Sequence, residues 1–269
     1  MNLKLKKFDM TNIKDNSIIV MIGKRNTGKS YLTRDFLYWR RDIPVGTVVS
    51  PTEHANKFFS NFIPPLFIHE EYGPELVANV IKRQRNIIGK INKGEYGDNV
   101  DPRAFLIFDD CLYDSSWTKD KNMRRIFMNG RHYKLTFLLT MQFALGIPPN
   151  LRTNIDYVFI LRENIVSNRK RLYEHYAGMF PTFDMFCTVM DKCTENFECL
   201  VIHNGSKSNK IEDQVFWYKA PDQPEFKIGA DQFWDYSDNN YNDDNYEDED
   251  DLNNFSGKKN KVKLNIKKV

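Results

Sequence analysis

One stretch of the sequence has the residue types and spacing of a phosphate-binding loop. It fits the pattern G-x-x-x-x-G-K-[ST] without a mismatch, as Gly23-Lys24-Arg25-Asn26-Thr27-Gly28-Lys29-Ser30. The two glycines allow a tight turn in which successive backbone N–H groups converge on the β- and γ-phosphates of a nucleotide. Lys29 supplies a positive charge to the phosphates, and the Ser30 hydroxyl is a ligand for Mg²⁺. These eight residues and Tyr31 are the predicted nucleotide-binding residues.

The loop also stands in the sequence context that this chemistry requires. An apolar run over 17–22 precedes it, and a helix is predicted to begin near Lys29. The positive end of a helix N-terminus favours bound phosphate. The alternative, a chance match, is disfavoured by this strand–loop–helix order.

A second candidate group is a pair of carboxylates at the end of a predicted buried strand. Four apolar residues, 105–108, are followed by Asp109 and Asp110. A phosphate loop needs an acid near its metal ion, and α/β sheets bind ligands at the carboxyl ends of their strands. Asp109 is predicted to hold Mg²⁺, directly or through water, and Asp110 to orient or deprotonate the attacking water. The alternative is that the pair only caps the following helix.

Gln142 follows another apolar run, 136–140, and is a candidate for contact with the γ-phosphate or the water. A glutamine that is merely exposed at a strand end is the alternative. This extra strand beyond the acidic one separates the additional-strand ATPases from nucleoside kinases.

Three arginines are candidates for the cation that stabilises charge developing on the γ-phosphate. Such an arginine often comes from a neighbouring subunit. Arg131 precedes the 136–140 run, Arg152 follows the glutamine strand, and Arg162 ends a further apolar run. An exposed surface arginine is the alternative for each of them.

The apolar runs predict the architecture that positions these groups. Six short runs are typical of buried parallel strands: 17–22, 46–50, 105–108, 136–140, 157–161 and 199–203. Apolar residues recur at helical spacing between the first and second runs, between the second and third, and after the third. Alternating strands and helices predict an α/β fold, with a mainly parallel sheet covered by helices on both faces.

Composition and charge set the domain organisation. The chain has 269 residues, 41% of them hydrophobic, which suffices for one large domain with a tail. Residues 231–255 hold ten acids and no Lys or Arg, and residues 256–269 hold six Lys and no acid. We therefore predict an ATPase domain over 1–230, with a net charge of +7, and a flexible tail over 231–269. With no run of about 18 apolar residues and only four cysteines, the expectation is a soluble intracellular protein.

Taken together, these features resemble the FtsK–HerA superfamily of DNA-pumping ATPases, and within it the genome-packaging ATPases of large nucleocytoplasmic DNA viruses, the poxvirus type. The resemblance spans about residues 17–203. It rests on the phosphate loop, the Asp109–Asp110 pair, the segment 130–132, Gln142, and the stretch from 151 to 162.

The resemblance implies a RecA-like core that works as a homo-oligomeric ring on double-stranded DNA. It implies ATP and Mg²⁺ as ligands, translocation of DNA into a preformed capsid, and a place at the viral assembly site in the host cytoplasm or in the virion. By position, Gln142 takes the sensor role and Arg131 the role across the subunit interface. Asp110 stands where many cellular relatives have Glu, and its shorter side chain leaves its role as base open.

DNA contacts are expected mainly to phosphates. The candidate basic clusters are Lys82, Arg83, Arg85 and Lys90, or Lys119, Lys121, Arg124 and Arg125; a solvated helix face is the alternative for each. Two other functions remain open: a helicase or recombinase-like ATPase, and a scaffold that binds ATP without appreciable turnover.

Overall fold

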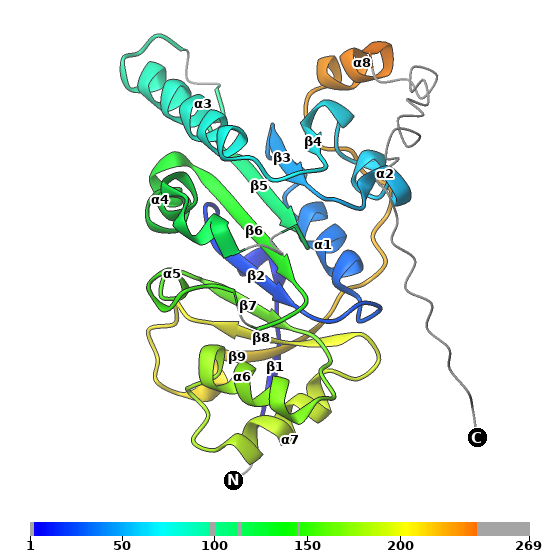
Figure 1. Cartoon of the computed structure of the whole chain (residues 1–269), viewed down its shortest axis with the longest axis vertical. Coiled ribbons are helices and arrows are strands. Elements are labelled where there is room, and N and C mark those ends of the chain that lie inside the picture. The colour runs from blue at the N-terminus through cyan, green and yellow to red at the C-terminus, as the bar shows by residue number, and fades with distance from the viewer. Residues whose placement is uncertain (1–2, 97–99, 112–114, 145, 241–269) are drawn as a thin grey trace, which may run out of the picture.

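The computed structural model describes residues 3–96, 100–111, 115–144 and 146–240. Within them, nine strands form one sheet in the order β1-β9-β8-β7-β2-β6-β5-β3-β4 (Figure 1). The strands are β1 (Lys6–Lys7), β2 (Ile18–Ile22), β3 (Gly46–Val49), β4 (Ile68–His69), β5 (Ala104–Asp109), β6 (Leu135–Met141), β7 (Tyr157–Ile160), β8 (Glu198–His203) and β9 (Val215–Lys219).

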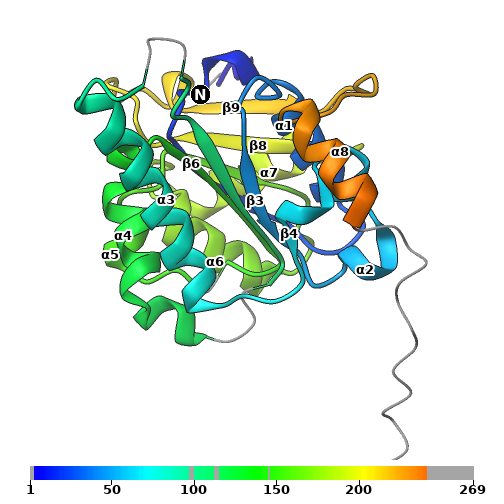
Figure 2. The ribbon, with the colours of Figure 1, turned by 90° about the horizontal axis from the view of Figure 1, so that it is seen from above.

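Helices cover both faces of this sheet, which confirms the predicted α/β class. They are α1 (Lys29–Tyr38), α2 (Glu53–Asn56), α3 (Pro74–Asn92), α4 (Lys121–Asn129), α5 (Pro149–Arg152), α6 (Val166–Tyr176), α7 (Phe183–Cys193) and α8 (Asp231–Asn240). Figure 2 shows α3 to α6 on one side, and α1, α2 and α8 on the other. No helix in the described ranges is long and apolar enough to cross a bilayer.

Two apolar cores, one on each face, explain why the central strands consist of unbroken apolar runs. In β2, Val20 packs into the core beneath α3 to α7, whereas Ile19 and Met21 pack into the core beneath α1. All five residues of β2 are buried. A strand buried on both faces has no exposed side, so its sequence does not alternate with polar residues.

The strand order places one strand between the phosphate loop and the acidic pair. β2 pairs with β6, and β6 pairs with β5, all in parallel register. The loop after β2 and the acids after β5 therefore lie at the same edge of the sheet, flanking the end of β6. This confirms the additional-strand arrangement.

One strand departs from the parallel expectation. β8 is antiparallel to both of its neighbours, β7 and β9. Two helices, α6 and α7, connect β7 to β8: the first leads away from the carboxyl edge and the second leads back to it. β8 therefore starts at the edge where β7 ended and must run the opposite way.

Residues 231–240, which the sequence analysis assigned to the tail, form α8. Trp234 is buried and its indole N–H donates to the Ile228 carbonyl at 3.0 Å, while Phe233 packs edge-on against Phe67. These contacts attach α8 to the sheet side that carries α1. The boundary between domain and tail stays a prediction, because 241–269 lie outside the described residues.

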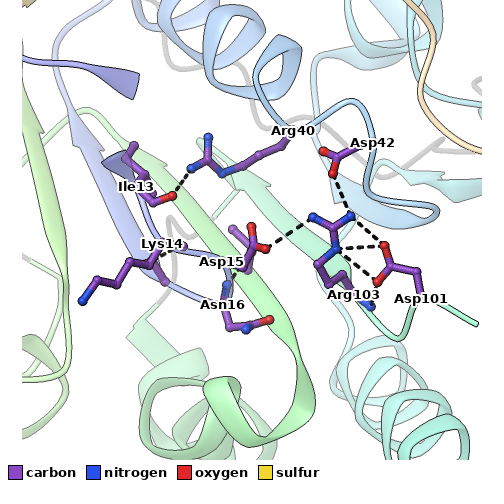
Figure 3. Close-up of polar contacts among 10 residues, drawn as sticks. Ile13, Lys14, Asp15, Asn16, Arg40, Asp42, Asp101 and Arg103 are labelled. Atoms are coloured by element: carbon purple, nitrogen blue, oxygen red, sulfur yellow. Dashed lines mark hydrogen bonds and ion pairs between the residues drawn. The ribbon is translucent and has the colours of Figure 1, made fainter. Parts of the chain in front are cut away.

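Arg103 ties together three segments at the opposite, amino edge of the sheet (Figure 3). Its guanidinium lies 3.3 Å from Asp15 before β2, 2.7 Å from Asp42 before β3, and 2.7 Å from Asp101 before β5. The hydrogen bonds that Arg103 donates to Asp101, opposed by burial and supported by Asp42, raise the pKa of Arg103. Arg103 thus fixes the loop-bearing and acid-bearing strands relative to one another from the far edge.

Candidate nucleotide-binding site

The phosphate loop is held between two strand ends. The Gly23 N–H donates to the Met141 carbonyl of β6 at 3.0 Å. Gly28 has a φ of 101°, a left-handed conformation that a side chain would strain, and it directly precedes the first residue of α1. The loop therefore ends directly at the N-terminus of α1, in the strand–loop–helix order that the sequence predicts.

Lys29 connects the loop to the acidic pair. Its side chain is buried, and its ammonium donates to the Gly23 carbonyl at 2.6 Å and lies 3.0 Å from Asp110 Oδ2. The structure thus brings together the two motifs that the sequence analysis placed in one site. Had they lain at opposite ends of the sheet, a shared triphosphate site would have been impossible.

Asp109 is surrounded by hydroxyl groups. Thr140 Oγ1 donates to Oδ1 at 2.7 Å, and Ser50 Oγ to Oδ2 at 3.4 Å. Burial, reinforced by the neighbouring Asp110 charge and opposed by the Thr140 hydrogen bond, raises the pKa of the Asp109 carboxyl. A carboxylate among hydroxyls is a set of hard oxygen donors that suits Mg²⁺. Ser30, the predicted second ligand, directly follows Lys29 and is exposed.

Asp110 has one carboxylate oxygen engaged and one unused. Oδ2 faces Lys29 and accepts from Gln142 Nε2 at 3.3 Å, whereas Oδ1 is buried without a hydrogen-bond partner among the described residues. The backbone of Asp110 is left-handed, with a φ of 48°, and its N–H donates to Thr140 Oγ1. Strained backbone of this kind is concentrated at functional sites. Gln142 thus contacts Asp110, and its role as sensor stays a prediction.

Glu163 is a residue of this site that the sequence analysis missed. It follows β7, is only 6% exposed, and its Oε1 lies 2.5 Å from Lys24 Nζ in the phosphate loop. It also accepts from the Ile165 N–H at 2.8 Å and from Asn168 Nδ2 at 3.0 Å. Burial would raise the pKa of Glu163, but these hydrogen bonds hold it below its ordinary value. A single glutamate in a polar segment gives no signal in a sequence.

We expect Glu163→Gln to lower the melting temperature by several degrees at pH 7. The variant loses the charge that three donors share, and a hydrogen bond to a charged group is worth about 1.5–3 kcal/mol. Because the pKa of Glu163 is depressed in the folded protein, its contribution is full above the ordinary pKa of a glutamate. It is lost as pH falls through the folded value, so the difference from wild type should shrink toward pH 4.

Thermal unfolding at several pH values measures this effect. Glu95→Gln is the matched control, since the Glu95 side chain is 49% exposed and pairs with Lys93, at 3.9 Å, beyond the end of α3. Equal melting temperatures of Glu163→Gln and wild type at pH 7 would contradict a stabilising role for the Glu163 carboxylate.

Two of the candidate arginines lie away from the phosphate loop of their own chain. Arg131 precedes β6 and forms an ion pair with Asp156, whose Oδ2 accepts from the N–H of Ile18 at the start of β2. β6 has seven residues, so Arg131 lies about 20 Å from the carboxyl edge. Arg152 ends α5 and stacks over the Tyr176 ring at 5.8 Å. Neither reaches Lys29 within one subunit.

Arg162 lies at the same edge as the phosphate loop. It follows Leu161, whose side chain touches the space beside Gly23, and its Nε donates to Asn164 Oδ1 at 3.1 Å.

Three residues of the two basic clusters line one surface groove. A cavity of about 390 Å³ between α3 and α4 is lined by polar and basic residues from both helices, with Ala78 and Ile81 at its base: Lys82, Arg85, Asn86, Asn122 and Arg125. The side chains of Lys82, Arg85 and Arg125 are exposed. The sequence analysis treats the clusters as alternatives, whereas the packing of α3 on α4 places Lys82 and Arg85 of one cluster and Arg125 of the other around the same groove.

A phosphate loop on β2, with an acidic pair on a strand separated from it by β6, defines a P-loop NTPase fold of the additional-strand type. The genome packaging NTPase B204 of Sulfolobus turreted icosahedral virus 2, solved with sulfate, has this fold. It matches with a TM-score of 0.55 at 12% identity, over 79% of this chain and all of that chain. The conjugation coupling protein TcpA matches with a TM-score of 0.51 at 10% identity, over 84% of this chain and 63% of that chain.

Similarity in sequence is much higher to proteins of large DNA viruses. Protein L437 of Acanthamoeba polyphaga mimivirus is 45% identical over 234 residues, which cover 86% of this chain and 82% of the relative. Protein 075L of Invertebrate iridescent virus 6 is 39% identical over 244 residues, which cover 89% and 92%. No family model matches the chain. The chain belongs to this family of large DNA virus proteins, and the predicted resemblance to a viral genome packaging NTPase is confirmed at the level of the fold.

Proposed function

We propose that this protein is an ATP-hydrolysing motor that moves double-stranded viral DNA into a capsid. The observation that carries the proposal is the meeting of Lys29, Asp110 and Gln142 at the carboxyl edge of β2 and β6. Two structural neighbours support the assignment to DNA transport, since one is a genome packaging NTPase and the other a conjugation coupling protein. The viral relatives fit the same assignment.

The chemistry follows from the positions of the side chains. The loop N–H groups and Lys29 bind the phosphates of ATP, and Ser30 with Asp109 would hold Mg²⁺, which neutralises charge developing on the phosphates. Binding of a phosphate to Lys29 competes with its ion pair to Asp110. Asp110 then has Gln142 as its partner and an unused buried oxygen, Oδ1, that can accept a hydrogen bond from the attacking water.

A ring of subunits gives the distant arginines a place to act. Arg131 lies at the amino edge and its side chain is 68% exposed, so it is available to a neighbouring subunit's site rather than to its own. Asp156 holds the Arg131 guanidinium, and Asp156 is itself held by the N–H of Ile18, the first residue of β2. We retain Arg131, and Arg152 as the second candidate, as predicted contacts across the interface of a homo-oligomer.

Long duplex DNA is expected to raise the rate of ATP hydrolysis. A motor couples turnover to movement along its track, so the rate without DNA should be the lower one. Steady-state phosphate release, with and without linear duplex of several kilobases, measures this. An unchanged rate would contradict the motor. A translocase on duplex DNA removes a third strand bound to the duplex, whereas a helicase separates the two strands of the duplex itself. Separation of the duplex strands without removal of a third strand would therefore favour the helicase. No release of phosphate under any condition would favour the scaffold.

The groove between α3 and α4 is the proposed DNA contact. Arg85→Gln combined with Arg125→Gln should weaken duplex binding and reduce the dependence of log K on log salt by about 2, since each phosphate contact contributes roughly 0.9. Lys170→Gln with Lys192→Gln, on α6 and α7, is the control because it removes the same charge from exposed sites elsewhere. Equal losses in both double variants would show only a nonspecific effect of net charge.

A further inference from the structure

An apolar pocket adjoins the phosphate loop on the side of β8 and β9. Its volume is about 700 Å³, within the range of roughly 300–1,000 Å³ that is usual for small-molecule sites. Gly28 and Tyr31 are among its lining residues, so the pocket adjoins the predicted nucleotide-binding residues. Its other apolar lining comes from residues of three further segments: Leu161, Phe197, Cys199, Trp217, Ala220 and Pro221.

Phe197 lies directly against the loop. A Cβ placed on Gly28 would lie 3.4 Å from Phe197 Cδ1, so the ring is in contact with the backbone of the last loop residue before α1. Even so, 68% of Phe197 is exposed, and Tyr31, which also lines the pocket, is 62% exposed. Two large aromatic side chains at one pocket thus remain open to solvent.

The backbone around Phe197 shows that the ring is held there at a conformational cost. The Glu198 N–H donates to the Glu195 carbonyl at 2.8 Å, which closes a turn with Asn196 and Phe197 at its centre. Both central residues have positive φ, 50° and 64°, the signature of a type I′ turn. Such turns favour Asn followed by Gly, and a bulky aromatic residue at the second position is an outlier. Strained residues of this kind are concentrated at ligand-binding positions.

We propose that this pocket takes the nucleobase of the bound nucleotide, with the Phe197 ring as its stacking surface and Tyr31 as the second wall. The proposal rests on the nucleotide-binding part of the proposed function. Gly28 and Tyr31, which line the pocket, flank Lys29 and Ser30 in the sequence, so a base in the pocket would lie next to phosphates bound at the loop. Every base has a π-face, so stacking on an aromatic ring binds it without a need for hydrogen bonds.

Phe197→Gly tests the proposal without straining the fold, because glycine is the residue that the turn favours. The variant should bind ATP about tenfold more weakly than wild type, the scale of one lost stacking contact. It should bind inorganic tripolyphosphate, which has no base, as wild type does. Phe197→Tyr should retain ATP affinity, and Asn196→Gly, in the same turn but without a ring to lose, is the matched control. Isothermal titration with the full chain measures all of these affinities.

Each outcome separates this proposal from the function on which it rests. If wild type and Phe197→Gly prefer ATP over tripolyphosphate by the same ratio of affinities, the base site is elsewhere and nucleotide binding stands. If Phe197→Gly loses ATP and tripolyphosphate equally, Phe197 only supports the loop, and the proposal is overturned. If wild type binds neither ligand, the proposal and the proposed function fail together.

Discussion

Lys29→Ala should abolish ATP hydrolysis, with a loss of at least about a hundredfold in rate, the scale on which a preorganised charge stabilises a transition state. The ammonium is buried at the end of the loop, within 3.0 Å of Asp110, so no other cation of the loop can take its place. The loop has two other cations: Lys24, which is ion-paired with Glu163, and Arg25, whose side chain is exposed.

Steady-state phosphate release and ATP titration check this expectation together. Lys170→Ala, an exposed lysine on α6, is the control for removal of one positive charge. Thermal unfolding must show that Lys29→Ala is folded, because the change leaves Asp110 without its ion-pair partner. A folded Lys29→Ala protein with undiminished turnover would remove the basis for the whole site.

The parts of the fold that could be predicted are those in which local sequence determines structure. Each of the six apolar runs forms a strand, because a strand buried on both faces must be continuously apolar. The phosphate loop could be located because its glycines and lysine occur at fixed spacing. The position of the acidic pair followed from the rule that parallel strands end at one edge.

The parts that could not be predicted depend on contacts between distant segments. The two-residue strands β1 and β4 exist only by pairing with longer neighbours. The antiparallel direction of β8 depends on the number of helices that precede it. Glu163 is important because Lys24, far from it in sequence, lies against it. Phe197 stands at a position where turn chemistry favours glycine, so the sequence around it does not resemble a turn.

Asp109→Asn is expected to remove ATP hydrolysis and to stabilise the fold at the same time. An amide is a poor ligand for Mg²⁺ compared with a carboxylate, and loss of metal-assisted charge stabilisation is worth several kcal/mol, on the order of a hundredfold or more in rate. The Thr140 hydroxyl can still donate to the amide oxygen, so the hydrogen bond at 2.7 Å can be retained.

The sign of the stability change follows from the raised pKa of Asp109. The folded protein holds this proton more tightly than the unfolded chain, so the free energy of unfolding falls as pH rises from the ordinary pKa through the raised one. The neutral amide avoids that cost, and the variant should melt a few degrees above wild type at pH 7. The gap should close in acid, below the ordinary pKa of an aspartate. Glu163→Gln has the opposite sign at pH 7, because hydrogen bonds and Lys24 depress the pKa of Glu163.

Melting curves of both variants across pH, with Glu95→Gln as the exposed control, separate the two carboxylates. A carboxylate that binds a divalent cation must stay ionised although burial disfavours its charge. Without the cation, the ionised form of such a carboxylate should therefore lower the free energy of unfolding. A carboxylate with a structural role should instead raise the free energy of unfolding when it is ionised. If Asp109→Asn were destabilising at pH 7 while turnover persisted, Asp109 would be of the second kind, and the metal would have to be held elsewhere.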